Sequence, residues 1–335
     1  MPITEKNLPL PKNLYVESTN RCNLQCKGCI QYRGNWELER DISLQELIMI
    51  TDQLPGLERA ALHGIGEPLL NKALPEMIRH LKKRDVFVLL NSNGILLDEK
   101  MQHELINVGL DELRISLDAA SAEGYRAMRS SNSFDGILAN LKRFENILKV
   151  RRKNHPKVSL WFLGTTENIA ELPDFIKVAA DIGIAEVYLQ RLVYFQDDDG
   201  YGLAKQNNTL VDSDMRAIEL IQKGQDLANE LGVQFNTSGL GIPADSLKGK
   251  SRSLAPWRTC YRPATLMYIT ANGHVLPCCI SPFSTIDYSS IILGNAFDTP
   301  LEEIWNGLKY KNFRKQRQTD APPVCCQGCG IFWSL

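Results

Sequence analysis

Several features that would assign a protein to a membrane, a secretory route or a nucleic acid are missing from this chain. It has no run of about 18 apolar residues, so no segment is long enough to cross a bilayer. The opening residues Met-Pro-Ile-Thr-Glu-Lys lack the apolar core of a secretory signal. Its net charge of −1 gives no sign of a nucleic-acid or membrane partner. We therefore expect a cytoplasmic protein that acts on something other than nucleic acid or lipid.

Cysteine, by contrast, is abundant and unevenly placed. The chain has nine cysteines among 335 residues, all within residues 22–29 and 260–329. A reducing compartment and a chain of this length both argue against a disulfide framework. Clustered cysteines in an intracellular chain usually indicate metal binding, so the two cysteine zones are the main candidate sites. Otherwise the composition, 44% hydrophobic and 23% charged, is ordinary for one large domain plus a small one.

The first zone places Cys22, Cys26 and Cys29 in one short loop, with Cys-x₃-Cys-x₂-Cys spacing. A [4Fe–4S] cluster is normally held by four thiolates, so three ligands leave one iron open to an exchangeable molecule. Zinc is the main alternative, but its structural sites need a second ligand pair and no histidine lies nearby to complete one. Three buried, inert cysteines are the remaining alternative.

Short apolar strands alternate with helices through the next part of the chain. We predict strands at 14–19, 59–63, 86–90, 112–118, 158–163 and 186–192. Ser43 and Glu46 form a capping box that predicts a helix start, and strand 158–163 is apolar enough to be buried on both faces. About six such β/α units predict a parallel sheet with helices outside it. Periodicity alone does not separate a partial barrel from an open, doubly wound sheet.

In either arrangement ligands gather at the carboxyl ends of the strands. The cysteine loop follows the first strand, and polar or glycine-rich segments follow the next three. These segments are Gly66-Glu67-Pro68, Asn91-Ser92-Asn93-Gly94 and Ser116-Leu117-Asp118. We therefore expect one site at this edge of the sheet.

The cysteine loop after a short apolar strand resembles the signature of the radical S-adenosylmethionine (radical SAM) superfamily. The resemblance implies a partial (β/α)₆ barrel whose open iron chelates SAM, which is then cleaved to a 5′-deoxyadenosyl radical. Gly28 stands where the family often has an aromatic residue, and Ile65 replaces the first glycine of the family's Gly-Gly-Glu motif. The resemblance to the radical SAM superfamily also implies a set of SAM-binding residues. In this chain they are Gly66, Glu67, Pro68, Asn91, Asn93, Ser116, Asp118, Arg129 and Gln190.

The second cysteine zone lies around a predicted hairpin and helix. Asn272-Gly273 between apolar runs predicts a β-hairpin over 266–277. Thr299 and Glu302 predict a capping box with Pro300 at the first helical position. The last turns of this one helix carry basic residues that we expect on a solvated face, with a surface for an acidic redox partner as the alternative; they are Lys309, Lys311, Arg314, Lys315 and Arg317.

This zone resembles the C-terminal SPASM/twitch extension of radical SAM enzymes, in its one-cluster form. The resemblance implies a single auxiliary [4Fe–4S] cluster, with a zinc ribbon as the alternative, on Cys260, Cys278, Cys326 and Cys329. Cys279 and Cys325 are left over: each is an alternative cluster ligand, a sulfur packed beside the ligands, a hydrogen-atom donor to a substrate radical or a buried inert thiol. We divide the chain into a barrel at 1–236, a bridge at 237–259 and a cluster domain at 260–335.

Together these resemblances imply a radical SAM enzyme that removes hydrogen from an unactivated C–H bond. We expect a flavodoxin or ferredoxin as electron donor, and dehydrogenation or epimerisation as the outcome. Because only about thirteen residues precede the first strand, no peptide-clasping domain fits there, which favours a small carbohydrate-like or aminocyclitol substrate. A peptide- or protein-modifying maturase is the first alternative. A non-catalytic iron–sulfur carrier or zinc-binding module is the alternative of another class.

Overall fold

The computed structural model describes residues 7–33, 37–193, 205–211, 213–237, 242–247, 255–285 and 287–327. The predicted ligand Cys329 lies outside the described residues. Within the described part, no helix is both long and apolar enough to span a bilayer.

One sheet runs through the whole described chain, in the order β10-β9-β8-β1-β2-β3-β4-β5-β6-β7. Its strands are β1 (Asn13–Val16), β2 (Arg59–Ala61), β3 (Phe87–Ser92), β4 (Glu112–Ser116), β5 (Lys157–Gly164), β6 (Glu186–Arg191), β7 (Gln234–Thr237), β8 (Leu266–Ile269), β9 (His274–Leu276) and β10 (Gly294–Asn295). Neighbouring strands from β1 to β7 are parallel, and β8 is also parallel to β1. The hairpin pair β8–β9 and the pair β9–β10 are antiparallel.

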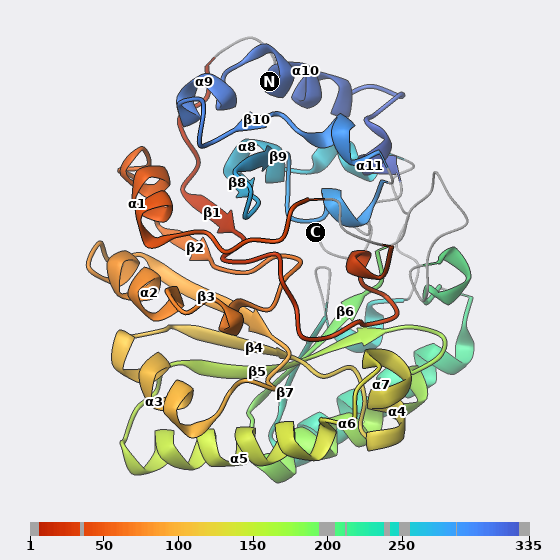
Figure 1. Ribbon diagram of the computed structural model, residues 1–335. Coiled ribbons are helices and arrows are strands. Elements are labelled where there is room, and N and C mark those ends of the chain that lie inside the picture. Colours follow the sequence, from red (N-terminus) through yellow and green to blue (C-terminus); the bar gives the residue numbers. More distant parts are fainter. Residues whose placement is uncertain are drawn as a thin grey trace.

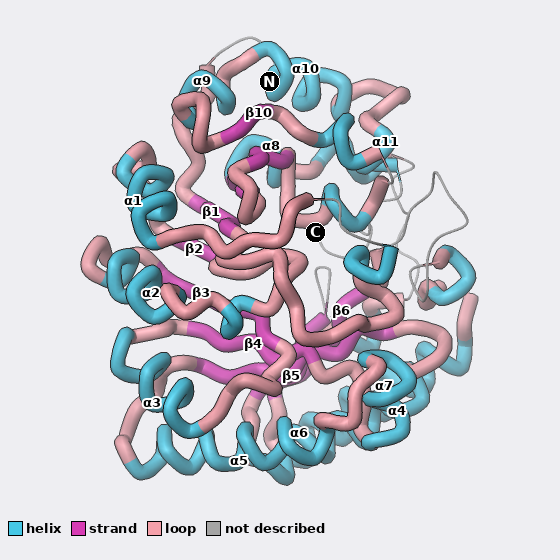
Figure 2. The backbone as a smooth tube through the Cα atoms, viewed as in Figure 1, coloured by secondary structure: helices cyan, strands magenta, loops and turns pink. Residues whose placement is uncertain are grey.

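Helices cover the outer side of this curved sheet, as Figure 1 shows for α1, α2, α3 and α5. Those of the barrel are α1 (Leu44–Asp52), α2 (Leu74–Lys82), α3 (Glu99–Val108), α4 (Ala122–Arg129), α5 (Phe134–Val150), α6 (Leu172–Ile182) and α7 (Met215–Leu231). The C-terminal part adds α8 (Arg262–Thr265), α9 (Leu301–Trp305), α10 (Leu308–Arg317) and α11 (Val324–Gln327). Short 3₁₀ helices are η1 (Ile30–Arg33), η2 (Pro68–Leu70), η3 (Ile169–Glu171), η4 (Gln206–Asn208), η5 (Pro243–Asp245), η6 (Pro256–Thr259), η7 (Ser281–Phe283) and η8 (Tyr288–Ile291). In Figure 2 loops, drawn in pink, occupy the side of the sheet away from these helices.

The predicted partial barrel is confirmed, with one more parallel strand than expected. Strand β7 reads Gln-Phe-Asn-Thr, and its single large apolar residue, Phe235, is too weak a pattern to predict a strand. In the described part of the chain β7 pairs only with β6, so the sheet stays open on that side. Because β8 hydrogen-bonds to β1, the C-terminal hairpin extends the barrel sheet, and the division at 237–259 remains a prediction.

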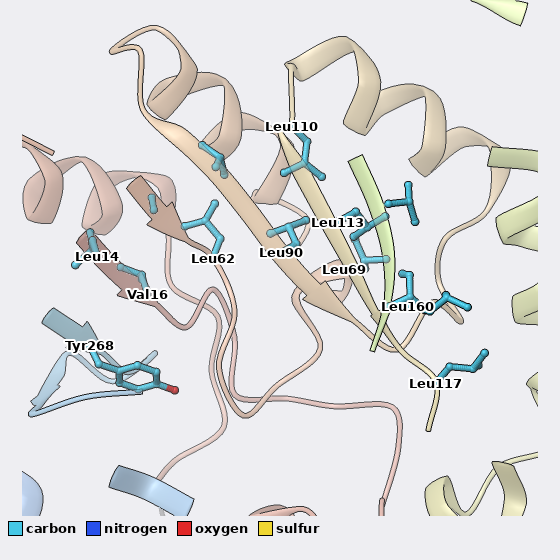
Figure 3. Close-up of a cluster of buried hydrophobic side chains, with 14 of the residues drawn as sticks. Leu14, Val16, Leu62, Leu69, Leu90, Leu110, Leu113, Leu117, Leu160 and Tyr268 are labelled. Carbon is cyan, nitrogen blue, oxygen red and sulfur yellow. The ribbon is translucent and has the colours of Figure 1, made fainter. Parts of the chain in front are cut away.

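The main core lies between the sheet and its outer helices. Leu14 on β1, Leu90 on β3 and Leu113 on β4 are 1% exposed or less and belong to the cluster of buried side chains in Figure 3. Successive residues of a strand point to opposite faces of the sheet. The residues that precede and follow each of these leucines on its strand therefore face the inside of the barrel. Burying each leucine stabilises the fold by about 1.5–3 kcal/mol, which fixes the register of the strands and hence the direction of the inward side chains.

The capping predictions had different outcomes. Ser43 accepts a hydrogen bond from the Glu46 backbone N–H, and the Glu46 carboxylate accepts one from the Ser43 N–H, so the first capping box is confirmed. The second is wrong: Pro300 is the N-cap of α9 and no side chain caps that helix. The predicted single helix also breaks at Gly307, where a Cβ would lie only 2.6 Å from the Glu303 carbonyl oxygen.

The expected solvated basic face of α10 is wrong at two positions. Arg314 and Arg317 are 2% and 3% exposed, whereas Lys309 and Lys315 are exposed. The Arg314 guanidinium donates to the Pro263 and Trp305 carbonyls and stacks on the Trp305 ring at 4.1 Å. Arg317 donates to the carbonyls of residues 257 and 258. Carbonyl acceptors pair part of each guanidinium, although Arg314 Nη2 and Arg317 Nε have no hydrogen-bond partner among the described residues. The two side chains together hold the segment around Cys260.

Candidate active site

A cavity of about 820 Å³ occupies the inside of the barrel. Its wall includes the first cysteine loop, the ends of β2 to β6, and residues before and after the C-terminal hairpin. Cys22 and Cys279 belong to the same wall, although they lie 257 positions apart in sequence (279 − 22). The two cysteine zones therefore meet at one cavity.

The loop that carries Cys22, Cys26 and Cys29 is held by backbone contacts at the mouth of the cavity. The Cys29 N–H donates to the Cys26 carbonyl at 3.0 Å, and the Lys27 N–H donates to the Met128 carbonyl at 3.3 Å. All three thiols line the cavity. In the described residues, no group of three or more histidine, cysteine or acidic side chains is already arranged at metal-binding distance. The donor set, three thiols on one loop, is the type that iron–sulfur clusters use.

Residues 64–67 pack directly against the start of the cysteine loop. A Cβ on Gly66 would lie 2.2 Å from the Thr19 carbonyl oxygen, so only glycine allows this approach. The Glu67 N–H donates to the Arg21 carbonyl at 2.8 Å. The Glu67 carboxylate is 3% exposed and accepts from Ser92 Oγ at 2.8 Å and from the Asn93 N–H at 2.7 Å. Burial raises the pKa of Glu67, against the opposing effect of these hydrogen bonds.

Arg129, at the end of α4, reaches the same loop. Its guanidinium forms an ion pair with Asp118, and its Nη1 donates to Cys26 Sγ at 3.5 Å. Asp118 has a left-handed φ of 62° and also accepts from the Leu163 N–H at 2.7 Å. Burial lowers the pKa of Arg129, but Asp118 and Cys26 outweigh it and raise the pKa above its usual value, so the cation is retained. Arg129 Nε is buried without a hydrogen-bond partner among the described residues.

Deeper in the cavity, the inward positions of β4, β5 and β6 form a second group. Arg114 lies with its guanidinium 4.6 Å from the ring centre of Trp161, which stacks on Tyr188 at 4.1 Å. Arg114 Nε donates to Glu112 at 2.6 Å, and Arg59 pairs with the same carboxylate at 3.6 Å. This end of the cavity therefore combines aromatic faces with fixed cations.

The auxiliary cysteines differ in their access to the cavity. Cys279 lines it, whereas Cys260, Cys278, Cys325 and Cys326 do not. Cys325 is 4% exposed, and its carbonyl accepts from Ser284 Oγ at 2.7 Å. Contacts between α11 and η7 bring residues 325 and 326 to the segment after Cys278. The fourth predicted ligand, Cys329, lies outside the described residues.

Two buried carboxylates join the barrel to the hairpin. Glu17, directly after β1, is 1% exposed and accepts from Tyr268 OH at 2.5 Å, from the Ile65 N–H at 3.0 Å and from the Ala271 N–H at 3.3 Å. It therefore touches β1, the loop before Glu67 and the hairpin. Burial raises the pKa of Glu17 to about 7.

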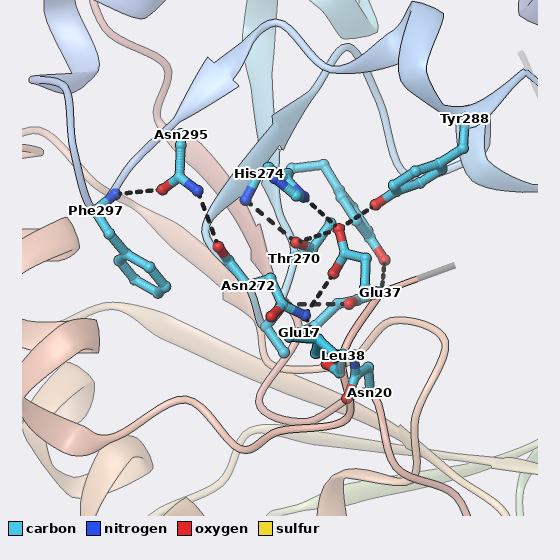
Figure 4. A network of polar contacts seen from close by, with 12 residues as sticks. Glu17, Asn20, Glu37, Leu38, Thr270, Asn272, His274, Tyr288, Asn295 and Phe297 are labelled. Carbon is cyan, nitrogen blue, oxygen red and sulfur yellow. Dashed lines mark hydrogen bonds and ion pairs between the residues drawn. The ribbon is translucent and has the colours of Figure 1, made fainter. Parts of the chain in front are cut away.

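Glu37 makes the second junction, shown in Figure 4. Its carboxylate is 8% exposed and takes four contacts from the C-terminal part. The partners are Thr270 Oγ1 at 3.0 Å, Asn272 Nδ2 at 2.9 Å, His274 Nδ1 at 2.6 Å and Tyr288 OH at 2.5 Å. The chain just after the first cysteine loop is thereby fastened to the hairpin of the auxiliary zone.

Most of the predicted SAM-site residues do meet at the cavity. They are Gly66, Glu67, Asn91, Asn93, Ser116, Asp118, Arg129 and Gln190, whereas Pro68 begins η2 and is not in the wall. Sequence reasoning missed Glu17, Glu37, Arg114, Trp161 and Tyr188. Strands β4 and β6 alternate buried and half-buried residues, and this period of two was the signal for their inward positions. In β5 this alternation was missed, because the strand was expected to be buried on both faces, whereas Trp161 is half-buried.

Comparison with protein families gives two matches. Residues 16–179 match the Radical SAM superfamily, and residues 260–330 match the SPASM iron–sulfur cluster-binding domain. The chain is 24% identical over 331 residues to a tungsten-containing aldehyde ferredoxin oxidoreductase cofactor-modifying protein of Pyrococcus furiosus, covering 94% of this chain and 86% of that protein. It is 24% identical to a PqqA peptide cyclase of Granulibacter bethesdensis, covering 95% of this chain and 79% of the cyclase. It is 27% identical to the mycofactocin maturase MftC of Mycolicibacterium smegmatis, covering 98% and 78%.

Solved structures share the fold. Streptococcus suis SuiB bound to the precursor peptide SuiA superposes with a TM-score of 0.69 at 15% identity, covering 96% of this chain and 70% of SuiB. BtrN in complex with AdoMet and 2-DOIA superposes with a TM-score of 0.51 at 16% identity, covering 96% and 94%. At these identities the likeness concerns the fold alone.

Proposed function

Because the chain belongs to the radical SAM superfamily and carries a C-terminal SPASM iron–sulfur domain, we propose that it removes a hydrogen atom from a carbon of a peptide and so modifies that peptide. An enzyme of this family uses a SAM-binding [4Fe–4S] cluster, SAM and auxiliary iron–sulfur chemistry. When bound, these groups supply a 5′-deoxyadenosyl radical and a route for electrons. The protein contributes ligands, orientation and exclusion of water.

The residues present suit these groups. Cys22, Cys26 and Cys29 would hold the SAM-binding cluster. The buried Nε of Arg129 is a donor that a carboxylate of SAM would satisfy, since an unpaired buried N–H is unfavourable. Gly66 and Glu67 would present backbone and carboxylate groups to its ammonium.

Cys260, Cys278, Cys326 and Cys329 would hold one auxiliary [4Fe–4S] cluster, with zinc as the alternative metal. Arg317 holds the carbonyls of residues 257 and 258 and so fixes the chain just before the predicted ligand Cys260. An electron donor of the flavodoxin or ferredoxin type completes the proposal.

The observation that carries the proposal is the single cavity between the two cysteine zones. A substrate in it would touch the SAM end at Cys26 and the auxiliary side at Cys279. If the outcome is epimerisation, Cys279 is the thiol placed to return a hydrogen atom, because it lines the cavity and Cys325 does not. If the outcome is oxidation, the auxiliary cluster would take the surplus electron instead.

The relatives support a peptide over a small sugar. Two of the three curated proteins described above carry names that refer to a peptide or to a maturase, and SuiB binds a precursor peptide. The expectation of a carbohydrate-like substrate depended on where the chain begins, and a chain end supports no such conclusion. The peptide hypothesis therefore replaces it.

Anaerobic reconstitution with iron, sulfide, SAM and dithionite tests the proposal. We expect 5′-deoxyadenosine from the wild-type chain and none above background from Cys26→Ala. Cys260→Ala is the matched control, because it should lose the auxiliary metal and keep SAM cleavage. Two complete clusters correspond to about eight irons per chain, and about four irons with one zinc would overturn the auxiliary-cluster assignment. No 5′-deoxyadenosine from the fully loaded wild type would overturn the function.

A further inference from the structure

We propose that the inner half of the cavity, walled by β4, β5 and β6, is a subsite for a carboxylate group of the peptide substrate, with the Arg114 guanidinium as its main donor. This inference rests on the proposed function, and it names the chemical group by which the substrate would be recognised. The carboxylate could belong to an aspartate or glutamate side chain or to the C-terminus of the peptide.

Arg114 is held in place on two sides. Its Nε donates to Glu112 Oε1 at 2.6 Å, and its plane lies over Trp161 at 4.6 Å. Trp161 is itself fixed by stacking on Tyr188 at 4.1 Å and by donating from Nε1 to Ser159 Oγ at 3.1 Å. A guanidinium that is already oriented loses little conformational entropy when it binds an anion.

In the part of the chain that the structure describes, the outer edge of this guanidinium has no hydrogen-bonding partner. Among the described residues, none hydrogen-bonds Nη1 or Nη2 of Arg114, although the side chain is only 15% exposed. Two parallel N–H groups of this kind match the two oxygens of a carboxylate. Arg114 lines the cavity two residues before Ser116 on β4, at the level of Asn91 on β3, so it lies deeper along the strand than Ser116 and Asp118.

The charges around this half of the cavity favour an anion. Arg114 and Arg262 line it and Arg59 lies behind the wall, against two carboxylates, Glu112 and Glu186. Both carboxylates already have protein partners. Glu112 contacts Arg59 and Arg114, and Glu186 accepts from Asn236 Nδ2 at 2.9 Å. Among the described residues of this half, three arginines therefore face two carboxylates.

His63 lies in the same wall, buried and close to two of these arginines. Burial, followed by the neighbouring Arg114 and Arg59, lowers the pKa of His63 to about 3, so its imidazole stays neutral. Tyr15, whose ring meets the His63 ring edge-on at 5.5 Å, also lies within range of the Arg114, Arg59 and Arg262 charges. Three arginines thus act on one small region, and a substrate carboxylate placed there would offset them.

Affinity selection on the immobilised, reconstituted full chain with SAM tests the inference. The probes are four pools of short synthetic peptides, matched in length and aromatic content. One pool carries glutamate with blocked ends and the second carries glutamine instead. The third has a free C-terminal acid without acidic side chains, and the fourth is its C-terminal amide. We expect the wild type to retain one acid pool at least about tenfold over its matched amide pool, since hydrogen bonds to charged groups commonly have this strength.

Arg114→Gln should bring that ratio close to one. Arg114→Lys should keep part of it, because the charge remains while the two-pronged geometry is lost. The matched control is Arg143→Gln, an arginine outside the cavity that donates to Gln102 and Asn140. It should leave the ratio unchanged. Iron content and thermal unfolding of each variant establish that it is folded and loaded.

The outcomes separate the inference from the function on which it rests. Peptides retained equally from acid and amide pools would overturn the carboxylate subsite and leave the peptide function standing. The same holds if folded Arg114→Gln keeps the wild-type ratio, because the Arg59–Glu112–Arg114 cluster would then be structural only. Retention of no peptide by wild type that still cleaves SAM would overturn both. The pool that is selected identifies the source of the carboxylate.

Discussion

The two ends of the cavity are built in opposite ways. At the SAM end, all the candidate groups but Gln190 come from consecutive β/α units between Cys22 and Arg129, and most of them lie at or just after the end of a strand. On the auxiliary side, the pieces come from residues 260–279, from α10 and from residues 325–326. They are brought together by long-range contacts, among them the pairing of β8 with β1 and the hydrogen bonds of Glu17 and Glu37 to the hairpin. The SAM end can therefore be predicted from a local sequence motif, whereas the auxiliary side depends on long-range contacts.

The buried charges differ in the same way. At the SAM end, Arg129 and Asp118 form an ion pair between two secondary-structure elements. At the junction, Glu17 and Glu37 are held mainly by neutral donors from tyrosine, threonine, asparagine and backbone groups. Removing one partner of a buried ion pair leaves a bare charge, whereas neutralising a hydrogen-bonded carboxylate leaves a weaker acceptor. Substitutions at the SAM end should therefore lower the free energy of unfolding by more than substitutions at the junction with the hairpin.

The largest effect is expected for Asp118→Asn. Asparagine tolerates the left-handed φ of this position, so the substitution removes the charge with little added backbone strain. It leaves the Arg129 cation buried without its counter-ion, and we expect the free energy of unfolding to fall by about 3–5 kcal/mol. Urea denaturation of the chain measures this.

Asp174→Asn is its control, since Asp174 pairs with Lys177 at the surface and its side chain is 67% exposed. A change below about 1 kcal/mol is expected there. Equal losses in the two variants would mean that burial of the Arg129 pair has no special importance.

An intermediate effect is expected for Glu37→Gln. The new amide would place an N–H₂ group beside donors that now meet a carboxylate, at a site that is 8% exposed. We expect a loss of about 2–3 kcal/mol, together with faster hydrogen exchange in the hairpin 266–276. Glu39→Gln makes the same charge change two residues away at an exposed position. Unchanged exchange in Glu37→Gln would show that the hairpin is held by its strand pairing alone.

The smallest effect is a dependence on pH at Glu17. Burial raises the pKa of Glu17 to about 7 in the folded chain, so between pH 5 and 7 the folded state binds more protons than the unfolded state. Stability must then decrease as pH rises, by roughly 2 kcal/mol across this interval. Glu17→Gln lacks this titration.

The difference in melting temperature between the wild type and Glu17→Gln, recorded across that pH range, is the measurement. The melting temperature of the wild type should fall relative to that of Glu17→Gln as pH increases. A flat difference would mean that Glu17 is ionised throughout or that the unfolded chain titrates alongside it.

Different parts of the structure could be predicted to different degrees. The β/α alternation from β1 to β6 and the Asn272-Gly273 hairpin were predictable because apolar spacing and turn chemistry act over a few residues. Burial of Arg314 was not, because nothing adjacent in sequence signals that the carbonyls of Pro263 and Trp305 will lie within reach. The position of Arg114 was predictable only in part. The alternation in β4 indicates which face of the strand Arg114 lies on, but it does not indicate that this face borders a cavity.

Neighbouring residues alone specify the three-cysteine loop, the alternation of strands and helices that makes the sheet parallel, and the polar segments at the strand ends. Contacts between distant segments specify that Cys279 and not Cys325 lines the cavity, that Glu17 and Glu37 join barrel to hairpin, and that Arg114 lies inside the barrel. Those facts depend on which distant segments exclude water from one another, and on which polar groups then find partners. A chain read in order does not contain that information at any single position.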